Sequence, residues 1–201
     1  MKSNVCYLYK GKGQESVLKE IEKTAVYCEL EHKESLQLRL LAEELTGMMT
    51  GIVGDYKARF WIEAENGKFN LHLLVEILLR REDREKLKEI SKGTTPAKGV
   101  MGKIRTFFET CSDNYSELGV YCAQNGQLMT NMESMYEASN VNAGLMTWSL
   151  KRYEEKVSKE KHSEEWDELE KSIVANLADD ISVKIQGHQT EIVVKKQFED
   201  A

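Results

Sequence analysis

The dipeptide Asn66-Gly67 lies between two runs in which apolar and polar residues alternate, and it constrains the fold more than any other feature of the sequence. Asn-Gly favours the two-residue turn of a β-hairpin, because both turn positions require a positive φ. Alternation with a period of two is typical of strands that have one face on a core. We therefore predict strands at residues 58–64 and 68–74, joined by a turn at residues 65–67.

The end of the chain carries a second alternating pattern. Isoleucine and valine residues alternate with polar residues over 181–185, and residues 191–198 are again β-prone. This pattern predicts a second hairpin with its turn at residues 186–189. A shorter β-prone run at residues 5–9, ended by glycines, predicts an additional strand at the start of the chain.

Two segments between the first strand and the first hairpin have the apolar spacing of amphipathic helices. The first covers residues 14–30. The second covers residues 35–54 and carries five apolar residues that advance by three, four, three and four positions: Leu38, Leu41, Leu45, Met48 and Ile52. These five share one helix face, which predicts packing of that face on a core. We also expect helices at residues 80–92 and 103–111, on either side of a loop at residues 93–102.

Charged residues become rare between residues 112 and 149, where only four occur: Asp113, Glu117, Glu133 and Glu137. We interpret residues 112–178 as an inserted or capping region that is mostly helical, within a single domain spanning residues 1–201. Strands joined by hairpins, with the helices collected together, predict an α+β fold. We expect a two-layer sandwich in which a mixed β-sheet is covered on one face by helices.

The composition narrows the class of protein. The chain has 41% hydrophobic and 31% charged residues with a net charge of -6, which is ordinary for a globular domain. An acidic chain gives no electrostatic reason to expect nucleic acid as a partner. No apolar run approaches the roughly 18 residues of a membrane helix. The four cysteines lack the C-x-x-C pairs of zinc sites, so we expect no metal site and a cytoplasmic protein with free thiols.

Residues 36–47, with the sequence LQLRLLAEELTG, resemble a helix of the GHKL superfamily of ATP-binding folds, and in particular the anti-sigma-factor serine kinases. In that family a glutamate on this helix is the general base, and an asparagine four residues later binds magnesium. Glu43 occupies the glutamate position, whereas Gly47 replaces the asparagine and supplies no side-chain oxygen. The resemblance implies a Bergerat-like fold in which Glu43 is catalytic only if the protein is active. The chain is also similar to a group of uncharacterised Firmicute proteins.

Two further elements of the family are changed. The Asp-x-Gly-x-Gly turn that reads the adenine has no match after the first hairpin. The glycine-rich loop is represented by Gly99 and Gly102, which precede a predicted helix, with Lys98 and Lys103 beside them. Free amides at a helix N-terminus favour anions, so one interpretation of this segment is a phosphate site. The other is an ordinary loop.

The helix face that carries Glu43 and Gly47 also carries Thr50 and Gly54. Small residues on one helix face leave a groove. One interpretation is the floor of a ligand pocket, and the other is close packing of another helix against the glycines. His72 lies beside apolar neighbours in a predicted strand, and we interpret it as a structural residue.

The resemblance implies a regulatory protein of the GHKL ATPase-like fold that binds ATP or ADP and has lost phosphoryl transfer. Phosphoryl transfer depends on metal ions and positioning, and the magnesium ligand is missing at position 47. The alternative is a non-catalytic protein-interaction module in which residues 112–178 fill the ancestral cleft. Both hypotheses predict a protein partner, and both leave its identity and the oligomeric state open.

Overall fold

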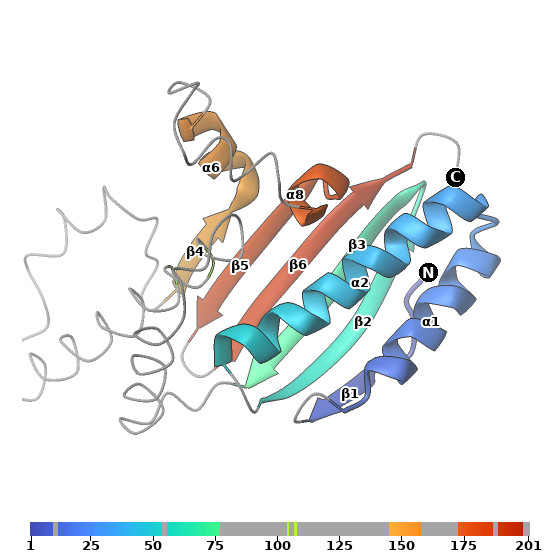
Figure 1. Ribbon diagram of the computed structural model, residues 1–201, viewed down its shortest axis with the longest axis horizontal. Helices are drawn as coiled ribbons and strands as arrows, with labels where there is room; N and C mark the ends of the chain where they lie inside the picture. Colours follow the sequence, from blue (N-terminus) through green and yellow to red (C-terminus); the bar gives the residue numbers. More distant parts are fainter. Residues whose placement is uncertain are drawn as a thin grey trace, which may run out of the picture.

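The computed structural model describes residues 1–9, 12–53, 56–76, 104, 107, 145–157, 173–186 and 189–198. Within these ranges the chain forms one six-stranded sheet with the order β1-β2-β3-β6-β5-β4 (Figure 1). The strands are β1 (Cys6–Tyr9), β2 (Lys57–Glu65), β3 (Lys68–Glu76), β4 (Leu145–Ser149), β5 (Asp180–Gln186) and β6 (Gln189–Gln197).

Every strand pairing in this sheet is antiparallel. The expectation of a mixed sheet is therefore wrong for the described strands. The physical reason lies in the β3–β6 pairing, which joins the two predicted hairpins. Leu73 of β3 lies opposite Ile192 of β6, and the two strands run in opposite directions. The prediction of an α+β class with both hairpins is confirmed.

The turn between β2 and β3 has the geometry that its sequence predicts. Asn66 has a φ of 49° and Gly67 a φ of 71°, so both central positions are left-handed. Such a turn matches the right-handed twist of the flanking strands and fixes their register. Phe60 is thereby paired with Leu73, and both side chains are fully buried.

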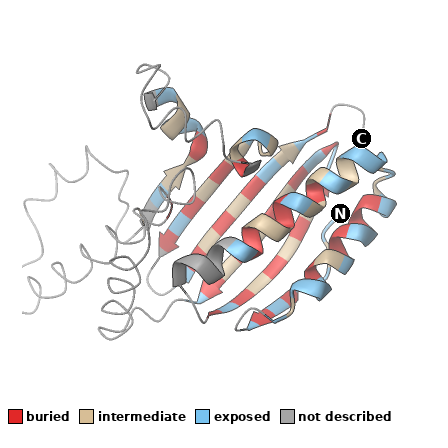
Figure 2. Ribbon diagram, viewed as in Figure 1, coloured by how far each residue is buried: buried red, intermediate tan, exposed pale blue. Residues whose placement is uncertain are grey.

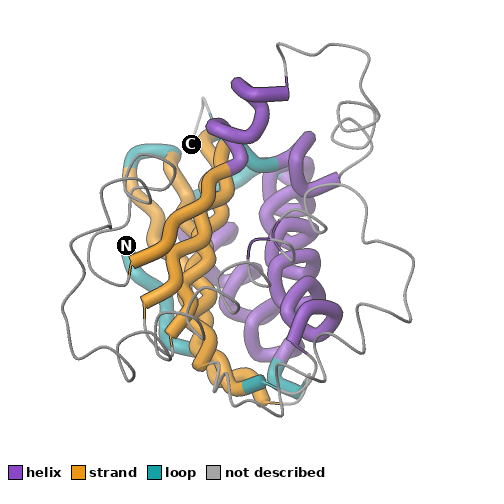
Figure 3. The backbone as a smooth tube through the Cα atoms, turned by 90° about the vertical axis from the view of Figure 1, so that its left-hand side faces the viewer, coloured by secondary structure: helices purple, strands orange, loops and turns teal. Residues whose placement is uncertain are grey.

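Helices α1 (Gln14–Tyr27), α2 (His32–Val53) and α8 (Ile173–Leu177) lie on one face of the sheet (Figures 1 and 3). Helix α6 (Leu150–Val157) follows β4 at the edge of the sheet. Alternate residues of β2 and β3 are buried beneath the helices, as the banding of the strands shows (Figure 2). The core thus lies between the sheet and its helical layer, which confirms the two-layer arrangement in the described residues.

Helix α1 begins directly after Gly13, which has a φ of 101°. A Cβ at this position would overlap the carbonyl oxygen of Tyr7, so the turn from β1 into α1 requires glycine. The carbonyl of Gly13 accepts hydrogen bonds from Ser16 and Val17 in the first turn of the helix. This turn lets α1 fold back over the strand that precedes it.

Strand β4 was not predicted, because it lies in the region that we expected to be mostly helical. It pairs with β5, where Trp148 lies opposite Val183. Of the predicted helix at residues 103–111, only Ile104 and Phe107 are described, and both are helical. The predicted elements at residues 80–92 and 93–102 lie outside the described residues.

Candidate functional site

Helix α2 presents the predicted Glu43–Gly47 face to the side away from the sheet. Leu38, Leu41 and Leu45 are fully buried against the sheet, whereas Leu36 and Leu40 on the opposite side are 46% and 42% exposed. At about 100° per residue, Glu43 and Gly47 fall on the same side as these exposed leucines. The five-residue stripe predicted from the sequence is buried at the three positions whose side chains are described.

The two ends of α2 are fixed by hydrogen bonds. The backbone N–H of Glu31 donates to the Glu34 carboxylate (3.0 Å), which caps the helix at its start. Near the other end, the buried Tyr56 hydroxyl donates to the backbone carbonyl of Thr46 (2.9 Å). Tyr56 directly precedes β2, so this bond holds the half of α2 that carries Gly47 against the sheet.

The carboxylate of Glu43 is bound by an arginine of its own helix. Arg39 Nε donates to Glu43 Oε1 (3.1 Å), and Arg39 Nη1 donates to Glu22 Oε1 of α1 (2.6 Å). The Arg39 guanidinium therefore joins α1 to the outer face of α2. A general base must accept a proton from its substrate, and the hydrogen bond from Arg39 occupies one of the two Glu43 oxygens.

Gly47 leaves open space on the outer face of α2. It is exposed, and in the described part of the chain a Cβ built at this position meets no atom within 4 Å. Close packing of another helix against this glycine, the second interpretation of the small-residue face, is therefore absent at position 47 among the described residues. The described backbone leaves room there for a side chain or a ligand.

The structure brings together only part of the predicted site. Glu43 and Gly47 lie one turn apart on α2. The predicted phosphate-binding residues lie outside the described residues: Lys98, Gly99, Gly102 and Lys103. Of the predicted site, the structure therefore describes only Glu43 and Gly47, on the outer face of α2.

The residues on the outer face of α2 do not fit a magnesium ion. Magnesium requires octahedral oxygen ligands, supplied by carboxylates and by the substrate's phosphates. Position 47 has no side-chain oxygen, and Glu43 is paired with Arg39. Among the residues that the structure describes, no group of three or more His, Cys, Asp or Glu side chains could hold a metal ion.

A cluster of aromatic and charged side chains lies on the other face of the sheet, which no described helix covers (Figure 3). The rings of Trp61 and His72 stack with centroids 4.8 Å apart and planes 7° from parallel. His72 Nδ1 is 3.1 Å from Glu191 Oε1, and His72 Nε2 is 3.6 Å from Glu63 Oε2. We call this side of the sheet the second face.

Glu63 links this cluster to the start of the chain. Lys2 Nζ lies 2.9 Å from Glu63 Oε1 and 4.9 Å from the centroid of the Trp61 ring. The hydrogen bond from Lys2, and then that from the Trp61 indole, hold the pKa of the Glu63 carboxyl below its usual range. The half-buried His72 ring contacts Glu191 through Nδ1, whereas its buried Nε2 has no hydrogen-bond partner among the described residues.

The interpretation of His72 as a structural residue stays a prediction, and the sequence did not indicate its partners. Its neighbours Leu71 and Leu73 point into the core, whereas His72 points to the second face, because side chains alternate along a strand. Trp61 lies directly opposite His72 on β2. Glu191 comes from β6, far away in the sequence, and only the pairing of the two hairpins brings it close.

No protein-family model matches the chain, and searches of curated proteins and of solved structures gave no match. In the ranges that the structure describes, the chain is an α+β protein with a six-stranded antiparallel sheet. None of the helices in the described ranges is both long and apolar enough to cross a membrane.

Proposed function

We propose that this chain is a regulatory protein of the GHKL ATPase-like fold that binds ATP or ADP at the outer face of α2 and does not transfer the phosphoryl group. The proposal rests on the resemblance of residues 36–47 to the GHKL helix; Gly47, one turn from Glu43, is exposed on the side of α2 away from the sheet, so among the described residues nothing blocks a ligand there. A glycine in the interior of a helix costs about 1 kcal/mol relative to alanine. Close approach of a ligand to the helix backbone accounts for that cost.

Loss of phosphoryl transfer follows from the same residues. The reaction requires a metal ion that bridges the phosphates and a group that orients the attacking nucleophile. Gly47 supplies no metal ligand, and Arg39 already binds the Glu43 carboxylate. Binding of a nucleotide without turnover suits a protein whose output is a change of partner rather than a chemical product.

The test is a thermal-shift titration with ATP and with ADP, each with and without magnesium, combined with an assay for released phosphate. We expect nucleotide to raise the melting temperature of the wild type in step with its concentration, because a ligand of the folded state alone stabilises it. Gly47→Leu fills the open space and removes the shift. Gln37→Leu adds the same side chain elsewhere on α2 and leaves the shift caused by nucleotide unchanged.

No phosphate is released in any of these samples if the proposal is correct. The absence of a shift at millimolar nucleotide would contradict nucleotide binding. Magnesium-dependent phosphate release that disappears in Glu43→Ala would contradict the loss of phosphoryl transfer.

A second candidate function, a non-catalytic protein-interaction module, is favoured by exposed apolar side chains on the helical layer. Val26 and Tyr27 at the end of α1 are exposed, as are Leu36 and Leu40 of α2. This function predicts no nucleotide shift. It also predicts that a Leu36→Ser, Leu40→Ser double variant has the melting temperature of the wild type. The variant should no longer cross-link to a partner protein that the wild type captures.

A further inference from the structure

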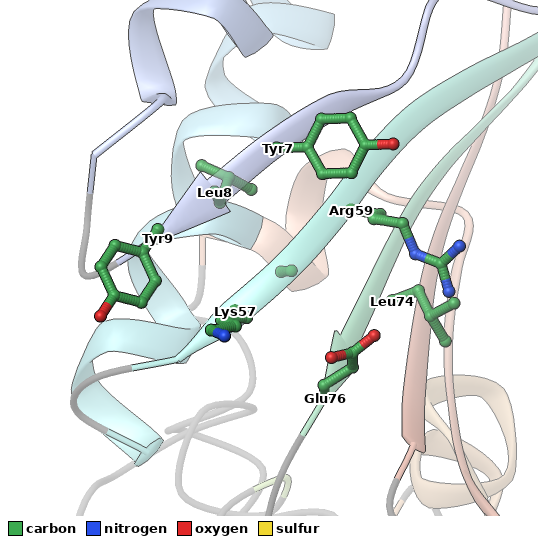
Figure 4. A pocket seen from close by; sticks show the side chains of 8 residues that line it. Tyr7, Leu8, Tyr9, Lys57, Arg59, Leu74 and Glu76 are labelled. Carbon is green, nitrogen blue, oxygen red and sulfur yellow. The ribbon is translucent and has the colours of Figure 1, made fainter.

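A groove on the second face of the sheet lies away from the helical layer and from the proposed nucleotide site. It has a volume of about 370 Å³ and is formed by side chains of β1, β2 and β3 (Figure 4). Two rows of residues that lie opposite one another across these strands line it: Tyr7, Arg59 and Leu74, and then Tyr9, Lys57 and Glu76.

The groove is walled by exposed aromatic side chains. Tyr7 is 72% exposed and Tyr9 is 50% exposed, although both belong to a strand whose alternate residues are buried in the core. Exposed tyrosine beside arginine is the composition of binding hot spots, because both side chains offer a large contact area and a polar end. The half-buried Leu74 supplies an apolar surface on the β3 side of Arg59.

The groove carries two cations, Arg59 and Lys57; Lys57 lies opposite Glu76 in the β2–β3 pairing, so the net positive charge of the groove corresponds to Arg59. Elsewhere on the described sheet, Lys195 pairs with Asp180 and Lys196 with Asp179, and Lys2 pairs with Glu63 of β2. In the described part of the chain, Arg59 and Lys57 form no salt bridge with a carboxylate.

Lys57 Nζ instead lies 5.9 Å from the centroid of the Tyr9 ring. A guanidinium held between a tyrosine and a leucine has five N–H donors with which to bind a carboxylate.

We propose that this groove binds an extended acidic segment of a partner protein. A carboxylate of that segment pairs with Arg59, and a neighbouring apolar side chain rests on Leu74, on the other side of Arg59 from Tyr7. The groove has two cations and only one acid, Glu76, in a chain with a net charge of -6. Two copies of the whole chain, each with a net charge of -6, repel one another. A short acidic segment meets the local positive charge of the groove without that repulsion.

Single-stranded nucleic acid also stacks on aromatic side chains and pairs with cations. A nucleic-acid strand needs several cations along its phosphate backbone, whereas the groove has two, Arg59 and Lys57, beside Glu76, on a chain with a net charge of -6. The groove inference is independent of the proposed nucleotide site, which lies on the opposite layer of the molecule.

The experiment selects displayed random peptides on the full-length wild type. The affinity of the enriched peptides is then measured by fluorescence anisotropy at low and high salt. We expect enriched sequences to combine Asp or Glu with an apolar residue, and their binding to weaken as salt rises. Arg59→Gln weakens binding about tenfold or more, since a hydrogen bond to a charged group is lost.

Lys184→Gln is the matched control, because it removes one exposed positive charge from the second face outside the groove. It should change the affinity by less than about twofold. Tyr7→Ala, at a position that is mostly exposed and therefore unimportant for folding, should also weaken binding.

Four results would overturn the proposal: enrichment of basic or purely apolar peptides, no enrichment, equal effects of Arg59→Gln and Lys184→Gln, or tighter binding of a single-stranded oligonucleotide than of any peptide. The nucleotide titration of Gly47→Leu is unaffected by any of these results, so the two proposals fail separately.

Discussion

Replacement of Gly47 by alanine tests whether the outer face of α2 is open. Gly47 lies inside a 22-residue helix, so its flexible backbone destabilises the folded state. Alanine restores helix propensity worth about 1 kcal/mol. No described atom lies within 4 Å of the added Cβ, so no steric cost offsets this gain. We therefore expect Gly47→Ala to raise the free energy of unfolding by about 1 kcal/mol.

The measurement is urea unfolding followed by circular dichroism, with the midpoint and slope fitted for both proteins. For a chain of this size, 1 kcal/mol corresponds to a rise in melting temperature of roughly 2–4 °C. The slope should not change, because the surface exposed on unfolding is nearly the same. A loss of stability of about 1 kcal/mol or more would show that another part of the protein packs against position 47. That result would contradict both the open outer face of α2 and the proposed nucleotide site.

Three further substitutions test the described fold. Gly13→Ala should destabilise the protein by more than about 1 kcal/mol in urea unfolding, because φ is positive and the new Cβ would overlap the Tyr7 carbonyl. Leu41→Ala should cost about 2–5 kcal/mol in the same assay, since the side chain is fully buried; a smaller loss would mean that α2 does not pack on the sheet. The pKa of Glu20 is lowered in the folded protein, chiefly by its hydrogen bond from Lys23. Its carboxylate therefore stabilises the fold at neutral pH, and this contribution is lost as the pH falls through the folded pKa. Glu20→Gln should therefore make stability less sensitive to acid in a pH series, and an unchanged acid transition would contradict this assignment.

The elements with a clear local signal could be predicted from the sequence. Helix α2 and the β2–β3 hairpin both have strong periodicity, and Asn66-Gly67 fixes the turn residue by residue. The Arg39–Glu43 ion pair has a local signal too, because residues four apart on a helix are neighbours, although we did not predict it. These features depend on residues close together in the sequence, so the chain itself contains the information.

The features that were missed depend on contacts between distant segments. Strand β4 has only five residues and extends because β5 offers an edge to pair with. A short segment of this kind takes its conformation from tertiary context rather than from propensity. The contact between His72 and Glu191 likewise requires the β3–β6 pairing. The groove on the second face arises from three strands together, and none of its residues stands out in the sequence alone.

The central claim is that a nucleotide binds the outer face of α2. The most direct measurement is the change in backbone amide chemical shifts of isotope-labelled protein during titration with ADP. The account predicts the largest changes on α2 around Glu43 and Gly47, with little change on the second face around Arg59 and His72. Changes confined to the second face, or no changes at saturating nucleotide, would contradict it.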